Sequence, residues 1–335
     1  MTADFDKPEV RYSFPRPETK LPFTGERFVS GLTGPIQHEH HHRYLFAAPL
    51  CAGKAVLDIA SGEGYGCRLL SQVASSVIGV DNDADAVRFA SDQYASEHLQ
   101  FLVGDATAIP VASASVDVVT SFETIEHFQD HERFLQEVSR VLRPGGLLVI
   151  SSPNRVIYSE LSGHVNEFHV RELDREEFRA ELLARFANVA VFEQRSLYGS
   201  AIVAERGEPA RVSSLNSPDG LAYDSYTGLP NVPYFVAVAS SGPLPDIANS
   251  LMSDGSYIGS LHNEIAALTN QVKASDAGGD ELHAQAAKKQ AEIEHIGDQL
   301  RHAESQLRAL RTAIEQWRQA SEAPKRSSPP PPQSR

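Results

Sequence analysis

The sequence predicts a doubly wound α/β domain with a mostly parallel seven-stranded sheet, followed by a C-terminal coiled-coil helix. Apolar runs of strand length alternate with stretches of helical period from Lys54 onward, which is the pattern of a parallel sheet with crossover helices. A glycine-rich loop follows the first of these runs. A heptad repeat of apolar residues towards the C-terminus predicts the coiled coil.

Seven runs have the length and composition of strands. They comprise residues 55–59, 77–81, 99–103, 116–122, 147–151, 186–192 and 232–239. Helical periods separate the first five, as at residues 84–94, where Val87, Ala90 and Tyr94 share one face. The last two runs are separated by an insertion at 198–230 that carries Gly, Ser and Pro, and we expect this insertion to form a lid on the substrate side.

Composition divides the chain into five parts. We expect a flexible N-terminal arm at 1–22, a globular domain at 23–242, a linker with a short helix at 243–280, the coiled coil at 281–320 and a disordered proline-rich tail at 321–335. The apolar seam runs from Leu282 to Trp317 at alternating spacings of four and three. A seam this narrow favours self-association, so we expect a homo-oligomer.

Charge and cysteine content exclude several classes of protein. The formal net charge of −14 at pH 7 argues against a nonspecific DNA or RNA binder, which needs clustered Lys and Arg. The two cysteines, Cys51 and Cys67, are too few for a disulfide framework, and the first residues do not read as a secretion signal. No apolar run approaches the roughly 20 residues that span a bilayer. We therefore expect a cytoplasmic protein without a transmembrane segment.

Acidic or glycine-rich residues follow three successive predicted strands, where open parallel sheets bind their ligands. The first strand runs into Asp58-Ile59-Ala60-Ser61-Gly62-Glu63-Gly64, the second ends at Asp81-Asn82, and Gly104-Asp105-Ala106 follows the third. Carboxylates at these positions can accept hydrogen bonds from ribose hydroxyls and an adenine amino group. An aspartate at one strand end is more typical of a turn, but the three together favour a nucleoside ligand.

These segments, together with Leu142-Arg143-Pro144-Gly145-Gly146, resemble the class I S-adenosylmethionine-dependent methyltransferases, which have a Rossmann-like fold. The resemblance implies that Gly62 and Gly64 border the methionine part of S-adenosylmethionine, Asp81 the ribose, and Asp105 with Ala106 the adenine. Ala60 stands where the family usually has its first glycine. The other residues expected to line the cofactor are Arg43, Asp58, Ala60, Asn82 and Glu123.

A second group of candidate residues follows the fourth predicted strand. Glu123, Glu126 and His127 have the spacing i, i+3, i+4, which predicts one helical face. Besides a purely structural role in a first helical turn, two interpretations are open. His127 is a general base oriented by Glu126, or all three residues hold a divalent cation that acidifies an acceptor hydroxyl.

The Glu-x-x-Glu-His pattern resembles that of ubiquinone-biosynthesis O-methyltransferases and small-RNA 2′-O-methyltransferases, in which such residues bind a metal. His169, in Asn166-Glu167-Phe168-His169, is a further candidate ligand beside Glu123, Glu126 and His127. Oxygen ligands with one or two imidazoles suit Mg²⁺ or Mn²⁺.

Two segments before the first strand, 25–28 and 39–44, are expected to cap the site. The four histidines between 38 and 42 do not share one helical face, so the run does not predict a compact metal site. Arg43 is the candidate to bind a carboxylate of the cofactor or of the substrate.

The two cap segments, the Glu-x-x-Glu-His segment and Asn166-Glu167-Phe168-His169 together resemble methyltransferases encoded with bacterial surface-polysaccharide enzymes. This resemblance implies a sugar hydroxyl or sugar phosphate of a glycan or its precursor as the methyl acceptor, and a glycan-assembly protein as a partner. Two alternatives remain: a noncatalytic coiled-coil scaffold with a cofactor-binding domain, and a methyltransferase of a small metabolite.

Overall fold

The computed structural model describes residues 11–14, 27–29, 35–196, 213–216, 224–227, 229–252 and 289. The chain forms two compact units, one made of residues 1–158 and 165–263 and the other of 159–164 and 264–335. The fold described below belongs to the first unit. The predicted coiled coil, apart from Lys289, the linker helix, the tail and most of the N-terminal arm lie outside the described residues.

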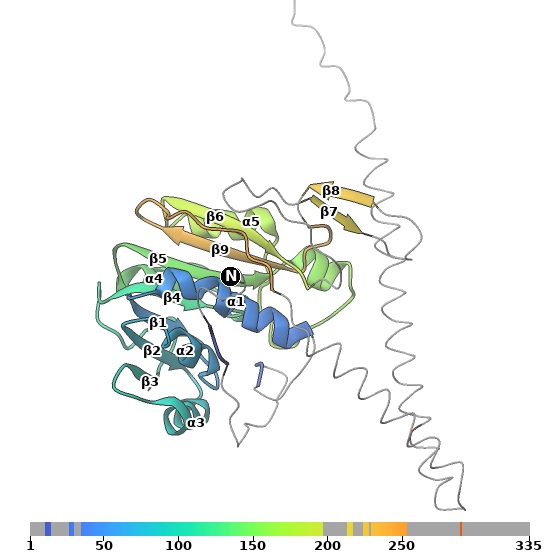
Figure 1. The fold of residues 1–335 in the computed structure, drawn as a ribbon. Coiled ribbons are helices and arrows are strands. Elements are labelled where there is room, and N and C mark those ends of the chain that lie inside the picture. The colour runs from blue at the N-terminus through green and yellow to red at the C-terminus, as the bar shows by residue number, and fades with distance from the viewer. Residues whose placement is uncertain are drawn as a thin grey trace, which may run out of the picture. The chain divides into compact units, whose positions relative to one another are not determined.

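The centre of the first unit is a sheet of seven strands in the order β3-β2-β1-β4-β5-β9-β6, which can be followed in Figure 1. The strands are β1 (Ala55–Ile59), β2 (Ser76–Asp81), β3 (Leu99–Val103), β4 (Val116–Ser121), β5 (Leu142–Pro153), β6 (Asn188–Gln194) and β9 (Tyr234–Ser240). All neighbours are parallel except β9, which is antiparallel to both β5 and β6. The predicted mostly parallel seven-stranded sheet is confirmed.

The predicted insertion between β6 and β9 contains two short strands, β7 (Ser213–Asn216) and β8 (Asp224–Thr227), which pair with each other in antiparallel fashion. The remainder of the insertion between residues 197 and 228 is outside the described residues. Its expected function as a lid stays a prediction.

The helices are α1 (Pro35–Cys51), α2 (Tyr65–Leu70), α3 (Ala84–Tyr94), η1 (Ile125–His127), α4 (His131–Val141), η2 (Val156–Glu160) and α5 (Arg175–Leu183). Side-chain caps begin three of them: Asp83 caps α3, Asp130 caps α4, and Asp174 forms a capping box with Glu177 at α5. These caps satisfy backbone N–H groups that have no partner within the helix.

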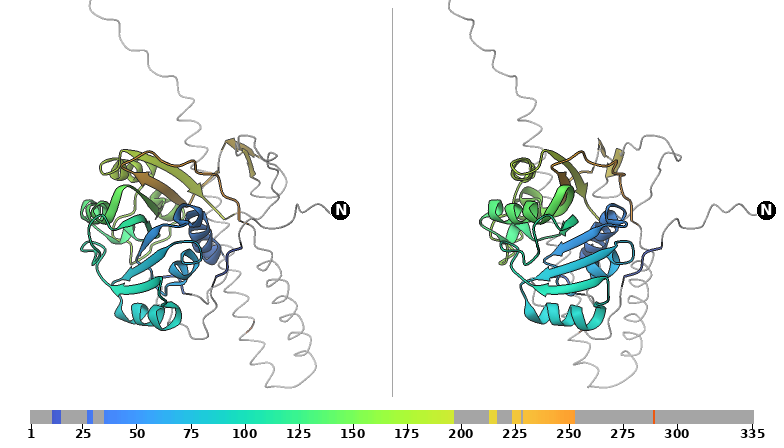
Figure 2. Two further views of the ribbon diagram at one scale, coloured as in Figure 1. Left: turned by 60° about the vertical axis from the view of Figure 1, so that its left-hand side comes forward. Right: turned by 90° about the vertical axis from the view of Figure 1, so that its left-hand side faces the viewer.

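Helices cover both faces of the sheet, so the unit has three layers (Figures 1 and 2). Side chains of α1, α2 and α3 pack with Val56, Val118 and Val149 on one face. Side chains of α4 and α5 pack with Leu57 and Val119 on the other. Neighbouring residues of a strand therefore face opposite cores, which explains why these strands are apolar throughout.

The parallel register brings the carboxyl ends of β1, β2, β3 and β4 to one edge of the sheet. Ile59 pairs with both Val80 and Ser121, and Asp81 pairs with Val103. The loops after these strands are therefore neighbours, which is where the sequence predicts the cofactor site.

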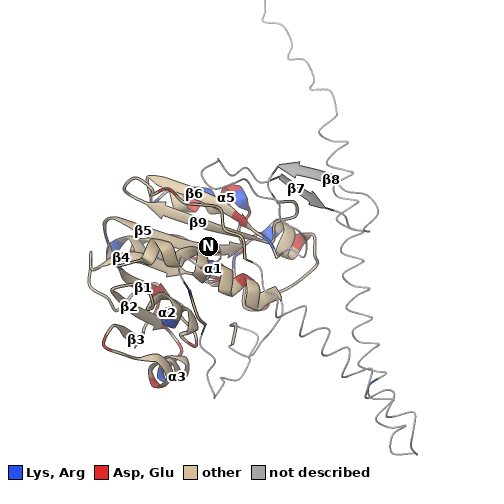
Figure 3. Ribbon diagram, in the orientation of Figure 1, with Lys and Arg blue, Asp and Glu red and all other residues tan. Residues whose placement is uncertain are grey.

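Charged residues lie mainly on helices, loops and strand ends, as Figure 3 shows for the described part of the chain. Cys51 and Cys67 are both buried free thiols. Among the described residues, no helix is long and apolar enough to cross a membrane.

Candidate functional site

The loop between β1 and α2 takes a sharply bent path with three residues in the left-handed conformation: Ala60 at φ 58°, Gly62 at φ 53° and Gly64 at φ 81°. An alanine in this conformation costs about 1–2 kcal/mol. The strain at Ala60 explains why glycine is usual at this position in the methyltransferases that the sequence resembles. The Ser61 N–H donates to the carbonyl of Val80 at 3.1 Å, which joins the loop to β2.

The glycines of this loop serve two different purposes. A Cβ atom on Gly64 would lie 2.7 Å from the Phe101 ring, and one on Gly66 would lie 2.0 Å from the Tyr44 ring. A Cβ atom on Gly62 would meet no protein atom within 4 Å. Gly64 and Gly66 therefore allow close packing inside the domain, whereas Gly62 leaves one side of the loop open to a ligand.

Below the loop, Asp58 is fully buried at the centre of a hydrogen-bond network. Thr120 Oγ1 donates to Oδ1 at 2.6 Å, and Tyr44 Oη and Cys67 Sγ donate to Oδ2 at 3.0 and 3.2 Å. Burial raises the pKa of Asp58 to about 6, although these three hydrogen bonds oppose the rise. Asp58 supports the loop from beneath by joining α1, α2 and β4.

Asp81, at the end of β2, holds the same loop from the side. Its Oδ2 accepts the Gly62 N–H at 2.8 Å and its Oδ1 accepts the Asp83 N–H at 2.9 Å. Asn82 is exposed beside it, and the Asp83 carboxylate forms an ion pair with Arg27 at 2.8 Å. The Asp81 carboxylate is therefore held in a fixed orientation beside Gly62.

Asp105 follows β3 and is tied to the same edge, because the Gly104 N–H donates to the carbonyl of Asp81 at 2.9 Å. The N–H and hydroxyl of Thr107 donate to Asp105 Oδ1 at 2.6 and 2.7 Å and hold its pKa below its usual range. Asp105 is exposed and Ala106 is half-buried. The structure brings both residues to the expected edge, and their contact with adenine stays a prediction.

Arg43, on α1, is a buried cation with unused hydrogen-bonding capacity. Its side chain is 1% exposed, and Nε donates to Gln194 Oε1 at 2.7 Å. The guanidinium lies 4.5 Å from the centre of the Tyr234 ring, and Nη1 lies 3.4 Å from Glu123 Oε1. Neither Nη1 nor Nη2 makes a hydrogen bond. Burial opposes the charged form, but Glu123, Tyr234 and Glu39 raise the pKa above its usual value.

Glu123 does not share a helical face with Glu126 and His127, so that prediction is wrong. Glu123 has φ 51°, which breaks any helix at this point, and only the single turn η1 follows. The Glu123 N–H donates to Ser151 Oγ, which in turn donates to Glu123 Oε1 at 2.7 Å. These contacts direct Glu123 towards β5 and Arg43.

Glu126, His127 and His169 nevertheless come together, with one possible ligand atom from each lying within 4.8 Å of the others. Glu126 is fully buried, and neither carboxylate oxygen makes a hydrogen bond. Burial, followed by the charge of Glu123, raises the pKa of Glu126 well above its usual value. A cation beside Glu126 would favour its ionised form. Glu123 is not part of this group, which differs from the predicted four-residue ligand set.

The segment 166–172 brings His169 to η1. The N–H groups of Val170 and Arg171 donate to the carbonyl of Glu126 at 2.8 and 3.0 Å. The ring Nδ1 of His127 lies 2.9 Å from the carbonyl of Phe168, which can only accept, so Nδ1 carries the proton. The two imidazoles meet edge to face at 5.3 Å.

The histidine run on α1 packs against aromatic rings and other polar groups. His41 stacks on Phe14 at 3.6 Å and His40 on Phe28 at 5.0 Å, while His42 Nε2 lies 2.9 Å from Ser250 Oγ. Among the described residues, the histidines of α1 belong to no three-residue group with metal-ligand spacing.

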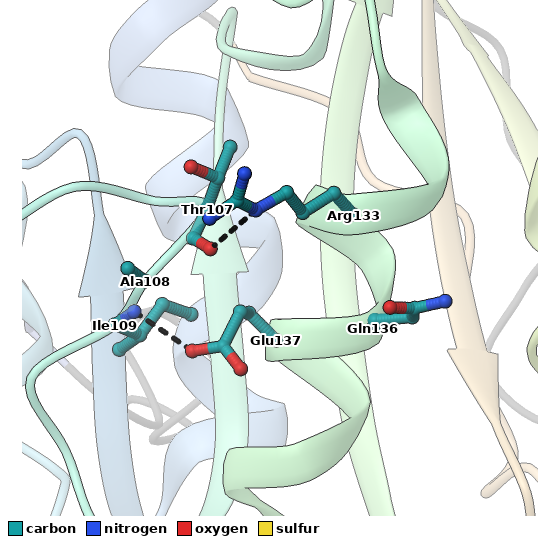
Figure 4. Close-up of a pocket in the computed structure, with 6 residues that line it drawn as sticks. All are labelled: Thr107, Ala108, Ile109, Arg133, Gln136 and Glu137. Atoms are coloured by element: carbon teal, nitrogen blue, oxygen red, sulfur yellow. Dashed lines mark hydrogen bonds between the residues drawn. The ribbon is translucent and has the colours of Figure 1, made fainter.

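A hollow of about 450 Å³ lies between the segment after β3 and α4, as Figure 4 shows. Its charged side chains already have partners: Arg133 Nε donates to Thr107 O, and Glu137 accepts from the Ile109 N–H and from Arg140. The hollow therefore offers less unused bonding capacity than the edge formed by the loops after β1 and β4.

Several residues of the site carry no signal in the sequence. Tyr44 and Thr120 reach Asp58 from other elements, Gln194 reaches Arg43 from β6, and Glu172 reaches His169. These are contacts between distant segments, and none has a spacing that a single sequence reveals. Glu172 alone is within one helical turn of a predicted ligand.

Comparisons with known proteins identify the type of domain. Residues 57–150 match the family described as a methyltransferase domain. Over 166 residues the chain is 40% identical to a probable S-adenosylmethionine-dependent methyltransferase of Mycolicibacterium smegmatis, which covers 49% of this chain and 63% of that protein. A probable S-adenosylmethionine-dependent methyltransferase of Mycobacterium tuberculosis is 38% identical over 175 residues, 51% of this chain and 63% of that protein.

A third relative, the phthiotriol/phenolphthiotriol dimycocerosates methyltransferase of Mycobacterium leprae, is 31% identical over 148 residues, 41% of this chain and 52% of that protein. The chain spans less than two thirds of the length of each of these relatives. The family match supports the predicted methyltransferase activity and places a methyltransferase domain at residues 57–150.

Proposed function

We propose that the protein is an S-adenosylmethionine-dependent methyltransferase that methylates a hydroxyl oxygen of a glycan or of its lipid-linked precursor. The observation that carries the proposal is that two groups follow neighbouring strands at the same edge of the sheet. The first is the open glycine loop with Asp81, and the second is the buried Glu126 with His127 and His169. The first suits a nucleoside cofactor and the second suits activation of an oxygen nucleophile.

The cofactor would bind across the carboxyl ends of β1, β2 and β3. Gly62 leaves space for a close approach, and the preoriented Asp81 carboxylate can accept from ribose hydroxyls. The two Nη groups of Arg43, which make no hydrogen bond although Nη1 lies 3.4 Å from Glu123 Oε1, fit a carboxylate such as that of the methionine part. S-adenosylmethionine would supply the methyl group as an electrophile on sulfur.

A divalent cation fits the Glu126, His127 and His169 group. The buried carboxylate has no hydrogen bond, and the proton on His127 Nδ1 places the lone pair of that ring on Nε2. One carboxylate with two imidazoles favours Mn²⁺ over Mg²⁺, since Mg²⁺ prefers oxygen ligands. A cation held there would lower the pKa of an acceptor hydroxyl.

The same geometry allows a metal-independent alternative in which His127 takes the proton from the acceptor hydroxyl. The Phe168 carbonyl holds the His127 ring with its lone pair on Nε2, as a general base requires. Methyl-transfer activity after chelation distinguishes the cation mechanism from the His127 base mechanism. Loss of methyl transfer with EDTA and its recovery with Mn²⁺ supports the cation, whereas full activity in EDTA supports His127 as the base.

Calorimetric titration with S-adenosylmethionine and its demethylated product tests the proposal. We expect binding by the full chain and at least tenfold weaker binding by Asp81→Asn, which loses the charged acceptor. An exposed control on α3, Asp92→Asn, should bind as the unchanged protein does. Absence of binding by the unchanged protein would overturn the proposal.

The glycan acceptor is supported by resemblance, and the name of the M. leprae relative gives a different class of acceptor for that protein. Mass spectrometry of surface glycan and of extracted lipid from a deletion strain distinguishes a glycan acceptor from a lipid acceptor. We expect the glycan to lose 14 Da per missing methyl group. Loss confined to the lipid fraction would refute the glycan acceptor.

Light scattering of the full chain would test the expected homo-oligomer. A molar mass equal to that of one chain would refute it.

A further inference from the structure

We infer that Glu172 is a positioning residue of the candidate cation site, because it holds the His169 ring in the orientation and tautomer that present Nε2 as a ligand. This inference rests on the proposed function. Glu172 Oε1 lies 2.5 Å from His169 Nδ1, and the two side chains are 9% and 8% exposed. Such a short contact between two nearly buried groups restricts the ring to one orientation.

The opposite side of the ring identifies the tautomer. The Phe168 N–H donates to Asn166 Oδ1 at 3.1 Å, so the amide of Asn166 must direct its NH₂ group elsewhere. Asn166 Nδ2 lies 2.9 Å from His169 Nε2. An NH₂ group has no lone pair to offer, so Nε2 is the acceptor and the ring proton is on Nδ1, facing Glu172.

The backbone keeps this arrangement beside Glu126. The N–H groups of Val170 and Arg171 donate to the Glu126 carbonyl, and Tyr158 stacks on the His169 ring at 5.4 Å. The segment 166–172 therefore places both the His169 ring and the Glu172 carboxylate beside Glu126.

A carboxylate on the second nitrogen of a ligating histidine fixes its tautomer and orientation, and its loss typically lowers metal affinity by about 10–100-fold. Without Glu172 the proton can move to Nε2, which then has no lone pair for a cation. The Asn166 amide occupies that lone pair when no cation is present, so it competes with the cation.

Titration of the full chain with Mn²⁺, followed by electron paramagnetic resonance of the free ion, tests the inference. We expect Glu172→Ala to weaken Mn²⁺ binding by about 10–100-fold. Glu172→Gln keeps an acceptor oxygen for Nδ1–H, so its affinity should fall less. Asn166→Ala removes the competing donor and should not weaken binding. The matched control Glu167→Gln changes an exposed carboxylate of the same segment and should bind as the unchanged protein does.

A second measurement does not need a cation. Long-range ¹⁵N–¹H spectra of the His169 ring should show the Nδ1–H tautomer in the unchanged protein and a shift towards Nε2–H in Glu172→Ala. Affinity for S-adenosylmethionine should stay unchanged in this variant, which also checks that it is folded.

The results separate the failure of this inference from that of the proposed function. Equal Mn²⁺ affinity in Glu172→Ala and the unchanged protein would overturn the positioning role while leaving the cation site intact. No Mn²⁺ binding by the unchanged protein would overturn the cation site and this inference, but S-adenosylmethionine binding would still support the methyltransferase. An unaltered tautomer in Glu172→Ala would refute the proposed mechanism of positioning.

Discussion

Replacement of Asp58 by Asn should change how the stability of the domain depends on pH. Asp58 is fully buried beneath the glycine loop, and burial raises its pKa to about 6 from an ordinary value of 3.8. A carboxyl group with a raised pKa in the folded state binds its proton more tightly when the protein is folded. Its contribution to stability is therefore fully present below about pH 3.8 and is lost as the pH rises through about 6.

The magnitude follows from the two pKa values. They differ by about two pH units, and each unit corresponds to about 1.4 kcal/mol, so the whole contribution is about 3 kcal/mol. About 2.4 kcal/mol of it is lost between pH 4 and pH 7, because an unfolded aspartate is already partly ionised at pH 4. Asn cannot titrate, and its NH₂ group cannot accept from Tyr44 or Cys67 as Oδ2 does. The variant should therefore be less stable than the unchanged protein at pH 4, and the difference should narrow by about 2.4 kcal/mol by pH 7.

Urea unfolding followed by circular dichroism at half-unit intervals from pH 4 to pH 7.5 would measure this difference. The control Gln93→Asn, which replaces an exposed residue that cannot titrate by another, should show a nearly constant difference from the unchanged protein over that range. A constant difference for Asp58→Asn as well would refute the argument, because it would mean that the Asp58 pKa is the same in the folded and unfolded states.

Two further substitutions test the packing and charge of the site. Gly66→Ala places a methyl group where it overlaps the buried Tyr44 ring, and we expect a loss of about 1–3 kcal/mol in thermal unfolding. Gly62→Ala, whose new methyl group meets no protein atom, should lose only about 1–2 kcal/mol, the cost of a left-handed alanine, and less than Gly66→Ala loses, so equal losses would contradict this packing argument. Arg43→Gln should weaken S-adenosylmethionine binding in calorimetry by at least tenfold, because a charge-assisted pair with the cofactor carboxylate is lost. Unchanged affinity would exclude Arg43 from the cofactor site.

The fold could be predicted because its strands are buried on both faces and therefore read as apolar runs. α5 was not predicted as a helix, although Asp174 and Glu177 form a capping box at its first turn. α1 was harder to recognise, since its buried face includes Arg43, a residue type that usually marks a solvent-exposed face.

The candidate site was predictable only where its residues follow a strand. Asp81, Gly62 and Asp105 lie at the predicted edge, because parallel strands end together. The helical face predicted for Glu123 was wrong because its backbone is left-handed. Such a conformation is usually marked in a sequence by glycine, and here the residue is a glutamate. Tertiary contacts, rather than helical spacing, bring His169 to Glu126.

The charges at this edge argue for ligand binding rather than for a structural role. Removing an ion from water costs several kcal/mol, and a buried ion pair offsets this only with good geometry and further hydrogen bonds. Arg43 and Glu126 are both buried, yet the Nη groups of one and the carboxylate of the other make no hydrogen bonds. Arg43 is directed towards Glu123 instead, which leaves Glu126 with the two histidines. Arg43 has the Glu123 carboxylate at 3.4 Å and feels the charge of Glu126, but neither contact supplies the hydrogen bonds that would offset the burial of these groups. The absence of hydrogen bonds at both groups fits two ligands of opposite charge, an anionic carboxylate at Arg43 and a cation at Glu126.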